Sequence, residues 1–136
     1  FLIDRTKAQA RAMERIEHYN IKGRPESRVA SLSGGNQQRA LLSLLPPGLR
    51  LLLMEHPTRG LDVESARWVW QQLLDRREEG TAIMFISADL DELLERSDRI
   101  VVFFGGHMME PLAANETTVE QLGYLIAGKQ RETAET

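Results

Sequence analysis

The sequence predicts an α/β fold whose sheet is mostly parallel and flanked by helices. Two short apolar segments, residues 49–55 and 81–87, are bounded by turn-forming residues, as expected of strands buried on both faces. An amphipathic segment, residues 63–79, lies between them, and a third apolar segment, residues 99–106, follows later in the chain. Strands that alternate with helices in this order are typical of parallel sheets with right-handed crossovers.

The first third of the chain is predicted to be helical. Apolar residues spaced by three and four indicate an amphipathic helix over residues 5–19, with Asp4 available as its cap. Residues 20–31 contain glycine, proline and several polar residues and are therefore expected to form a loop. Ser33 can cap a second helix from about residue 34 to 45, which two consecutive prolines then end.

The remaining elements follow from turn signals and apolar patterning. The long helix begins after Asp62 and closes at Gly80. A short acidic helix is expected over residues 90–97, and one more helix over residues 117–127. Two consecutive glycines after the third strand predict a hairpin that returns along an edge. For residues 49–55, a short buried helix is the alternative to a strand.

Composition excludes several classes of function. The chain has 136 residues, which fits one domain or a piece of one, and it opens on Phe1 without an initiator Met, which suggests a segment of a longer protein. With 17 Lys and Arg against 20 Asp and Glu, the net charge is -3, so the chain has no basic field to hold nucleic acid. It has no cysteine, which excludes disulfides and thiolate metal sites, and no apolar run approaches the ~18 residues that a membrane span needs.

Two segments have residues suited to phosphate chemistry. The Ser33 hydroxyl and the amides of Gly34 and Gly35, at the start of a helix, would offer hydrogen-bond donors to an anion, and the helix dipole would add favourable potential. The alternative is that these residues only cap the helix. An apolar strand that ends in Glu55 could present a carboxylate to magnesium at the carboxyl edge of a sheet, or could simply end in solvent. Taken alone, the acidic side chains within residues 89–92 are expected to form a solvated helix face.

Taken together, the order and spacing of the motifs resemble those of ATP-binding-cassette (ABC) ATPases. The sequence LSGGNQQ, residues 32–38, resembles the signature motif, and MEHPTRGLD, residues 54–62, resembles the Walker B strand and D-loop. The sequence FISADLDELLERSDRI, residues 85–100, resembles the H-loop region. GGNQQ combined with PTRGLDV resembles the subgroup that carries two cassettes in one polypeptide and energises uptake of simple sugars or nucleosides. Within that subgroup, the chain resembles the carboxyl-terminal part of the second cassette.

The resemblance implies a role for each residue of the signature motif and the D-loop. Ser33, Gly34 and Gly35 would contact the γ-phosphate of an ATP held by the partner cassette, because the signature motif of this family acts in trans. Gln37 would belong to the same helix start. Asp62 would lie in the D-loop, beside the opposing nucleotide.

The resemblance also implies a degenerate nucleotide site on this chain's own strand. Glu55 stands where the family has the acid that associates with Mg²⁺. His56 stands in place of the glutamate that polarises the attacking water, and Ala88 in place of the switch histidine. An imidazole could accept a proton, but an alanine side chain makes no hydrogen bond. Because no GxxxxGK[ST] loop occurs, we expect weak ATP binding and no ATPase activity from this chain alone.

The resemblance implies a partial P-loop NTPase fold, and it also implies which partners the chain has. Residues 1–48 would form part of the helical signature subdomain, residues 49–128 the α/β core, and residues 129–136 a flexible tail. The partners would be the first cassette of the same polypeptide and membrane-spanning permease subunits, at the cytoplasmic face of the cell membrane. A missing central strand would expose apolar sheet surface, so we expect self-association. The alternative function is a regulatory or assembly module of the transporter that does not contact ATP.

Overall fold

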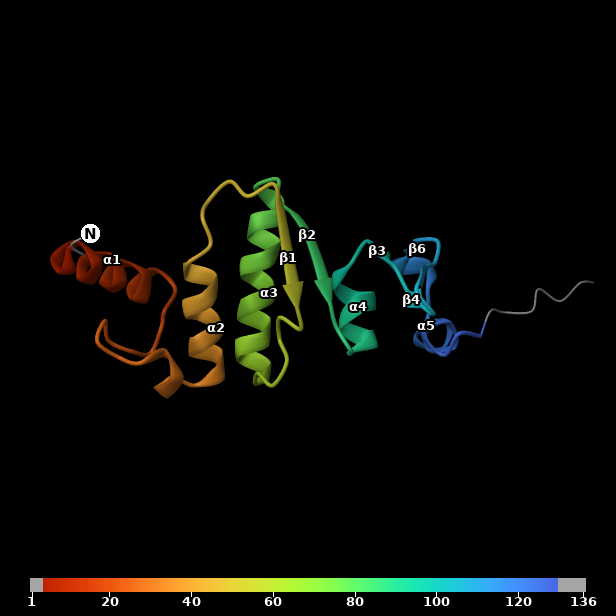
Figure 1. Cartoon of the computed structure of the whole chain (residues 1–136), viewed down its shortest axis with the longest axis horizontal. Helices are drawn as coiled ribbons and strands as arrows, with labels where there is room; N and C mark the ends of the chain where they lie inside the picture. Colours follow the sequence, from red (N-terminus) through yellow and green to blue (C-terminus); the bar gives the residue numbers. More distant parts are fainter. Residues whose placement is uncertain (1–3, 130–136) are drawn as a thin grey trace, which may run out of the picture. The chain divides into compact units, whose positions relative to one another are not determined.

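The computed structural model describes residues 4–129, which form two compact units, one ending at Ile86 and the other beginning at Ser87 (Figure 1). The first unit contains α1 (Arg5–His18), the 3₁₀ helix η1 (Val29–Ser31), α2 (Gly34–Ser43), β1 (Leu51–Glu55), α3 (Val63–Glu78) and β2 (Ala82–Ile86). The second contains α4 (Leu90–Arg96), β3 (Arg99–Ile100), β4 (Phe103–Phe104), β5 (His107–Met108), β6 (Leu112–Ala113), the 3₁₀ helix η2 (Ala114–Glu116) and α5 (Val119–Ile126).

Strands β1 and β2 form the parallel pair that the sequence predicts, with α3 as the crossover between them. The register runs from Leu51 opposite Ala82 to Glu55 opposite Ile86. Figure 1 shows α3 beside this sheet and α2 on the far side of α3. The strands and the long helix therefore lie where apolar patterning places them.

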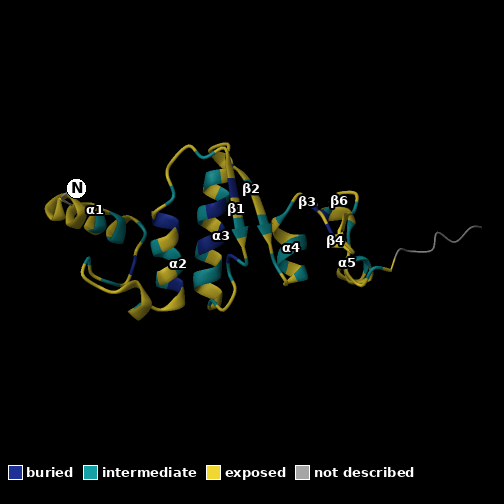
Figure 2. Cartoon of the chain, in the orientation of Figure 1, coloured by how far each residue is buried: buried dark blue, intermediate teal, exposed yellow. Residues whose placement is uncertain are grey.

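The core of the first unit lies between α2, α3 and one face of the sheet. Its buried residues are Leu42, Leu52, Val69, Trp70 and Leu73. Val69 and Leu73 are fully buried and four residues apart, so they share one helix face. Figure 2 shows buried segments of α3 in dark blue. Burial of a side chain of this size contributes about 1.5–3 kcal/mol to folding.

The other face of the β1–β2 sheet is exposed and apolar. Alternation along the strands turns four large side chains away from α3, and their exposed fractions lie between 53% and 63%. We call this surface the open sheet face; its residues are Leu51, Leu53, Met84 and Ile86. Within the described part of the first unit, residues 4–86, no helix or strand covers it.

The second unit corrects the prediction of a third parallel strand over residues 99–106. This segment instead forms two short strands, of which β3 pairs antiparallel with β6 and β4 pairs antiparallel with β5. Gly105 and Gly106 both have positive φ angles, 57° and 80°, as the predicted hairpin turn requires. A two-residue turn brings β5 against β4 locally, whereas a parallel partner would need a long crossover.

Other boundaries differ little from those expected. Helix α1 is capped by Asp4, whose carboxylate accepts from the Lys7 amide at 3.1 Å, as predicted. The division between the two units falls inside residues 49–128, and the predicted domain bounds stay predictions. Apart from residue 129, the predicted tail lies outside the described residues. Within residues 4–129, none of the helices has both the length and the apolar character needed to cross a membrane.

The start of α3 is fixed by Asp62. Its carboxylate accepts from the Ser65 amide at 2.9 Å and from the Ser65 hydroxyl at 2.8 Å. The amide of Ser65, followed by its hydroxyl, lowers the pKa of the Asp62 carboxyl below its ordinary value of 3.8. The charged form of Asp62 is therefore the form that stabilises the beginning of α3.

The Asp62→Ala variant is expected to unfold at a lower temperature than the unsubstituted chain at neutral pH. Because the folded-state pKa of Asp62 is depressed, its stabilisation is present above the unfolded-state pKa and disappears as the pH falls through the folded-state pKa. Thermal unfolding followed by circular dichroism should show a difference in Tm at pH 7 that narrows as the pH falls below 3.8. A difference that stays constant over this range would contradict the capping role.

Candidate functional site

The candidate site lies at one end of the first unit, where four element ends meet. Figure 1 shows the amino-terminal ends of α2 and α3 and the carboxyl-terminal ends of β1 and β2 at this same end. Ligands of open α/β sheets bind outside the carboxyl ends of the strands. The fold therefore brings Ser33, Glu55 and Asp62 to the end of the unit where such a ligand would be expected.

The signature turn, residues 32–38, packs directly against the start of α3. A Cβ atom built on Gly35 would lie 2.3 Å from the Ser65 hydroxyl oxygen and 2.9 Å from the Ser65 Cβ. At Gly34 the nearest side-chain atom to such a Cβ would be the Leu61 Cδ2, at an ordinary 3.6 Å. Gly35 is therefore required by close helix packing, and this packing joins the signature turn to the D-loop segment, residues 60–62.

The outward part of the signature turn consists of Ser33 and Gly34, which are exposed, whereas Gly35 is buried. Ser33 occupies the N-cap position, but its side chain makes no capping hydrogen bond to the backbone. Its hydroxyl oxygen instead accepts from the Asn36 side-chain amide at 2.8 Å. Ser33 thus stands at the predicted N-cap position, but its side chain does not cap the helix as predicted.

Gln37 is occupied within the turn itself. Its side-chain amide donates to the Leu32 carbonyl at 2.8 Å, and its backbone amide donates to the Ser33 carbonyl at 2.9 Å. Through these two bonds Gln37 holds the backbone carbonyls of Leu32 and Ser33, just before α2 begins.

The Walker B segment ends in two residues with different environments. Glu55 is exposed at the last position of β1, opposite Ile86. His56 has a positive φ angle of 47°, in the left-handed region where histidine is among the better-tolerated non-glycine residues. Its amide donates to the Ile86 carbonyl at 2.7 Å and extends the strand pairing by one bond. The His56 side chain therefore branches from the backbone at the point where the chain turns away from the sheet.

A magnesium ion would find only part of its ligands here. Among residues 4–129, no group of three or more His, Cys, Asp or Glu side chains could hold a metal ion. Mg²⁺ usually takes one or two carboxylates and completes its shell with water and substrate phosphates. The single carboxylate of Glu55 fits one ligand of a nucleotide-bound Mg²⁺ and does not make a separate metal site.

Ala88 lies in the second unit, in the exposed turn that leads into α4. The polar side chains beside it shape the turn. The Ser87 hydroxyl donates to Glu92 at 2.7 Å and accepts from the Asp89 amide at 3.1 Å. Asp89 caps α4 by accepting from the Asp91 and Glu92 amides. At position 88 the side chain adds no polar group to this turn.

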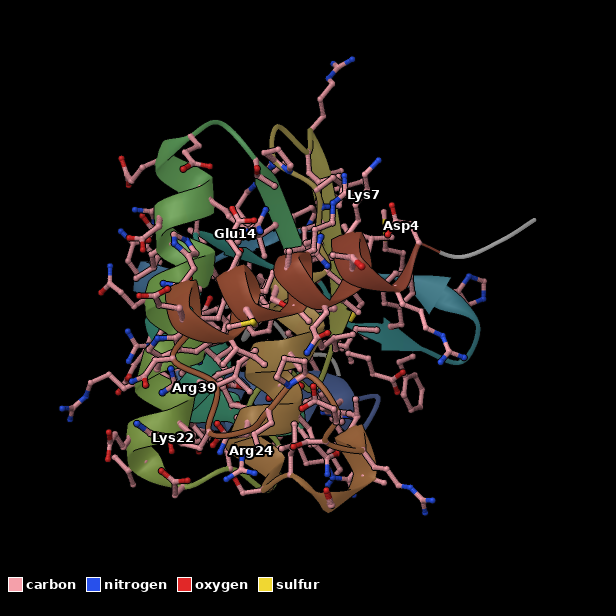
Figure 3. All side chains as sticks on the ribbon, turned by 90° about the vertical axis from the view of Figure 1, so that its left-hand side faces the viewer. Asp4, Lys7, Glu14, Lys22, Arg24 and Arg39 are labelled. Atoms are coloured by element: carbon pink, nitrogen blue, oxygen red, sulfur yellow. The ribbon has the colours of Figure 1, made fainter. Side chains whose placement is uncertain are left out.

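Sequence reasoning missed a polar hollow of ≈ 330 Å³ beside the signature turn. It is lined by the loop after α1 and by the first turns of α2 and α3, and includes Lys22, Asn36 and Arg39. Figure 3 shows Lys22 and Arg39 on the side of the unit that carries α1. The Arg39 guanidinium lies 4.0 Å from the centroid of the Trp68 ring. No periodic signal could reveal this hollow, because its residues come from separate segments.

Comparisons by sequence and by structure both find ATP-binding proteins of transporters, although no protein-family model matches the chain. The chain is 38% identical over 128 residues to the nucleoside import ATP-binding protein NupA of Lactococcus lactis subsp. cremoris (strain MG1363), covering 93% of this chain and 25% of that protein. It is 36% identical over 126 residues to the guanosine import ATP-binding protein NupO of Bacillus subtilis (strain 168), covering 91% and 25%. It is 36% identical over 132 residues to the ribose import ATP-binding protein RbsA 1 of Rubrobacter xylanophilus, covering 95% and 26%. The chain thus spans about a quarter of the length of these relatives.

Solved structures share the fold. An inward-facing metal-chelate-type ABC transporter matches with a TM-score of 0.67 and 20% identity, over 93% of this chain and 51% of that one. The dimeric ATP-binding cassette MJ0796, bound to ADP and Pi, matches with a TM-score of 0.64 and 21% identity, over 85% and 50%. In sequence the chain is thus similar to import ATP-binding proteins over about a quarter of their length, and its fold is part of the P-loop NTPase fold of ABC cassettes.

Proposed function

We propose that the chain is part of the ATP-binding component of an ABC importer for simple sugars or nucleosides. The names of the relatives in sequence support this class of transporter. The observation that carries the proposal is the exposure of Ser33 and Gly34 at the amino-terminal end of α2. A hydroxyl and free helix amides at such an end, together with the helix dipole, favour a bound phosphate.

In this proposal the signature turn completes an ATP site in trans. Ser33 and the amides of Gly34 and Gly35 bind the γ-phosphate of an ATP held by the first cassette of the same polypeptide. The packing of Gly35 on Ser65 supports this, because it holds the turn and the D-loop segment at one end of the unit. Asp62 then orients the D-loop at the nucleotide, while Gln37 maintains the shape of the turn.

The nucleotide site on this chain's own strand is proposed to be slow or inactive. Mg²⁺, when bound with ATP, neutralises charge on the β- and γ-phosphates, and Glu55 would be one of its ligands. His56, at the position after Glu55, is the candidate general base of this site. The side chain of Ala88 can hydrogen-bond neither water nor phosphate. ATP binding by this chain alone is weak in this proposal, because it has no GxxxxGK[ST] loop.

The partners follow from the same proposal. The chain works with membrane-spanning permease subunits at the cytoplasmic face of the cell membrane. Its net charge of -3 supports a role without nucleic acid.

Ser33→Arg is expected to abolish ATP hydrolysis in the assembled transporter. The long cationic side chain would fill the space of the γ-phosphate, and loss of a transition-state donor alone costs roughly 100-fold in kcat. His56→Ala should change kcat by less than about threefold, because its site contributes little to turnover. Steady-state phosphate release from the purified transporter in lipid measures both. Loss of turnover in His56→Ala together with full activity in Ser33→Arg would overturn the asymmetry.

The isolated chain is expected to form dimers or higher oligomers through the open sheet face. Apolar side chains and free strand edges favour pairing with a second copy. Static light scattering should show an oligomer for the unsubstituted chain and a monomer for the double variant Leu53→Lys with Met84→Lys. The matched control is Met13→Lys with Val29→Lys, which adds the same charge at two residues that are each 58% exposed and lie outside the sheet. A monomeric unsubstituted chain would contradict this prediction.

A further inference from the structure

Two hydrogen bonds in series connect the loop after α1 to the hydroxyl of Ser33. The Lys22 amide donates to the Asn36 Oδ1 at 2.7 Å. The Asn36 Nδ2 donates to the Ser33 Oγ at 2.8 Å. Asn36 is the third residue of α2, so one side chain joins the loop to the residue just before the helix.

The direction of this chain of bonds is fixed by chemistry. A backbone N–H can only donate, so the atom of Asn36 that faces Lys22 must be its oxygen. The nitrogen of the same amide must then face Ser33, and this nitrogen can also only donate. The Ser33 oxygen is therefore the acceptor, and its own proton points elsewhere.

That proton has no acceptor among the described residues. Ser33 makes no side-chain capping bond, and no other residue of 4–129 receives a hydrogen bond from its hydroxyl. The residue is exposed at the end of the unit that carries the signature turn. A hydroxyl that accepts one hydrogen bond is polarised and becomes a better donor in the next. The site thus presents a directed donor, which suits an anion and not a cation.

The loop that supplies the first donor is itself held in place. Ile21 is 8% exposed, the Arg39 guanidinium donates to the Tyr19 carbonyl at 3.2 Å, and the Lys22 ammonium donates to the Asn20 side chain at 3.0 Å. The Lys22 amide is therefore a fixed donor on one wall of the polar hollow.

We propose that Asn36 is a positioning residue that fixes the Ser33 hydroxyl as a donor to the terminal phosphate of the nucleotide. The inference rests on the proposed function, because it concerns the same signature turn. Asn36 does not touch the phosphate in this arrangement. It acts through the Ser33 oxygen, and its own orientation is set by the Lys22 amide.

A double-mutant cycle in the assembled transporter tests this inference. Ser33→Ala, Asn36→Ala and the double variant are compared by steady-state kcat and KM for ATP. Loss of Asn36 leaves the hydroxyl free to rotate, so kcat should fall on the order of tenfold when Ser33 is present. In the Ser33→Ala background the same change should have almost no further effect, because the group that Asn36 orients is gone.

Asn36→Asp keeps the side chain's size and its acceptor for the Lys22 amide, but replaces the donor to Ser33 by an acceptor. Ser33 must then donate to the aspartate and lose its free proton, so kcat should fall without a drop in Tm. Asn20→Asp is the matched control, because it places the same charge on the same hollow and keeps the acceptor for the Lys22 ammonium. Its kcat should match that of the unsubstituted transporter.

The outcomes separate the two levels of the proposal. If Ser33→Ala leaves kcat unchanged, the proposed function of the signature turn fails. If Ser33→Ala lowers kcat while Asn36→Ala adds an independent loss in the double variant, the positioning role is overturned and the function stands. The positioning role is equally overturned if Asn36→Asp retains full kcat or if Asn20→Asp loses as much as Asn36→Asp.

Discussion

The close approach of the amino-terminal ends of α2 and α3 is the constraint on which the rest of the site depends. Ser65 takes part in it twice. Its amide and hydroxyl bind the Asp62 carboxylate, and its side chain occupies the space that any Cβ on Gly35 would fill. A glycine in the signature turn and a capping aspartate in the D-loop are thus parts of one contact. This contact turns two distant sequence motifs into a single surface at one end of the first unit.

The fold could be predicted where its signals are local. The β1 and β2 strands and α3 follow from apolar runs, an amphipathic stripe and a capping aspartate, all of which are readable within a few residues. The third strand was predicted wrongly because an apolar run does not specify its partner. In the second unit, Gly105 and Gly106 allow β4 to pair with its immediate neighbour β5, and that local pairing replaces the expected parallel one.

The candidate site could be located from sequence but not its internal connections. Glycines and a serine at a helix start indicate an anion-binding turn, and the structure places Ser33 and Gly34 at its surface. The sequence does not show that Gly35 is needed for packing, since that depends on Ser65, 30 residues away. Nor could it show the bond from the Lys22 amide to Asn36, which joins a loop of no regular pattern to the first turn of α2.

Recognition of a neighbour's phosphate by the signature turn can be measured most directly as an affinity. Isothermal titration calorimetry would compare binding of this chain to the first cassette loaded with a non-hydrolysable ATP analogue and to the same cassette loaded with ADP. Because the contact is made to the γ-phosphate, the Kd should be at least about tenfold lower with the ATP analogue, a difference of about 1.4 kcal/mol. Equal affinities for the two loaded forms would contradict a phosphate-binding role for this turn.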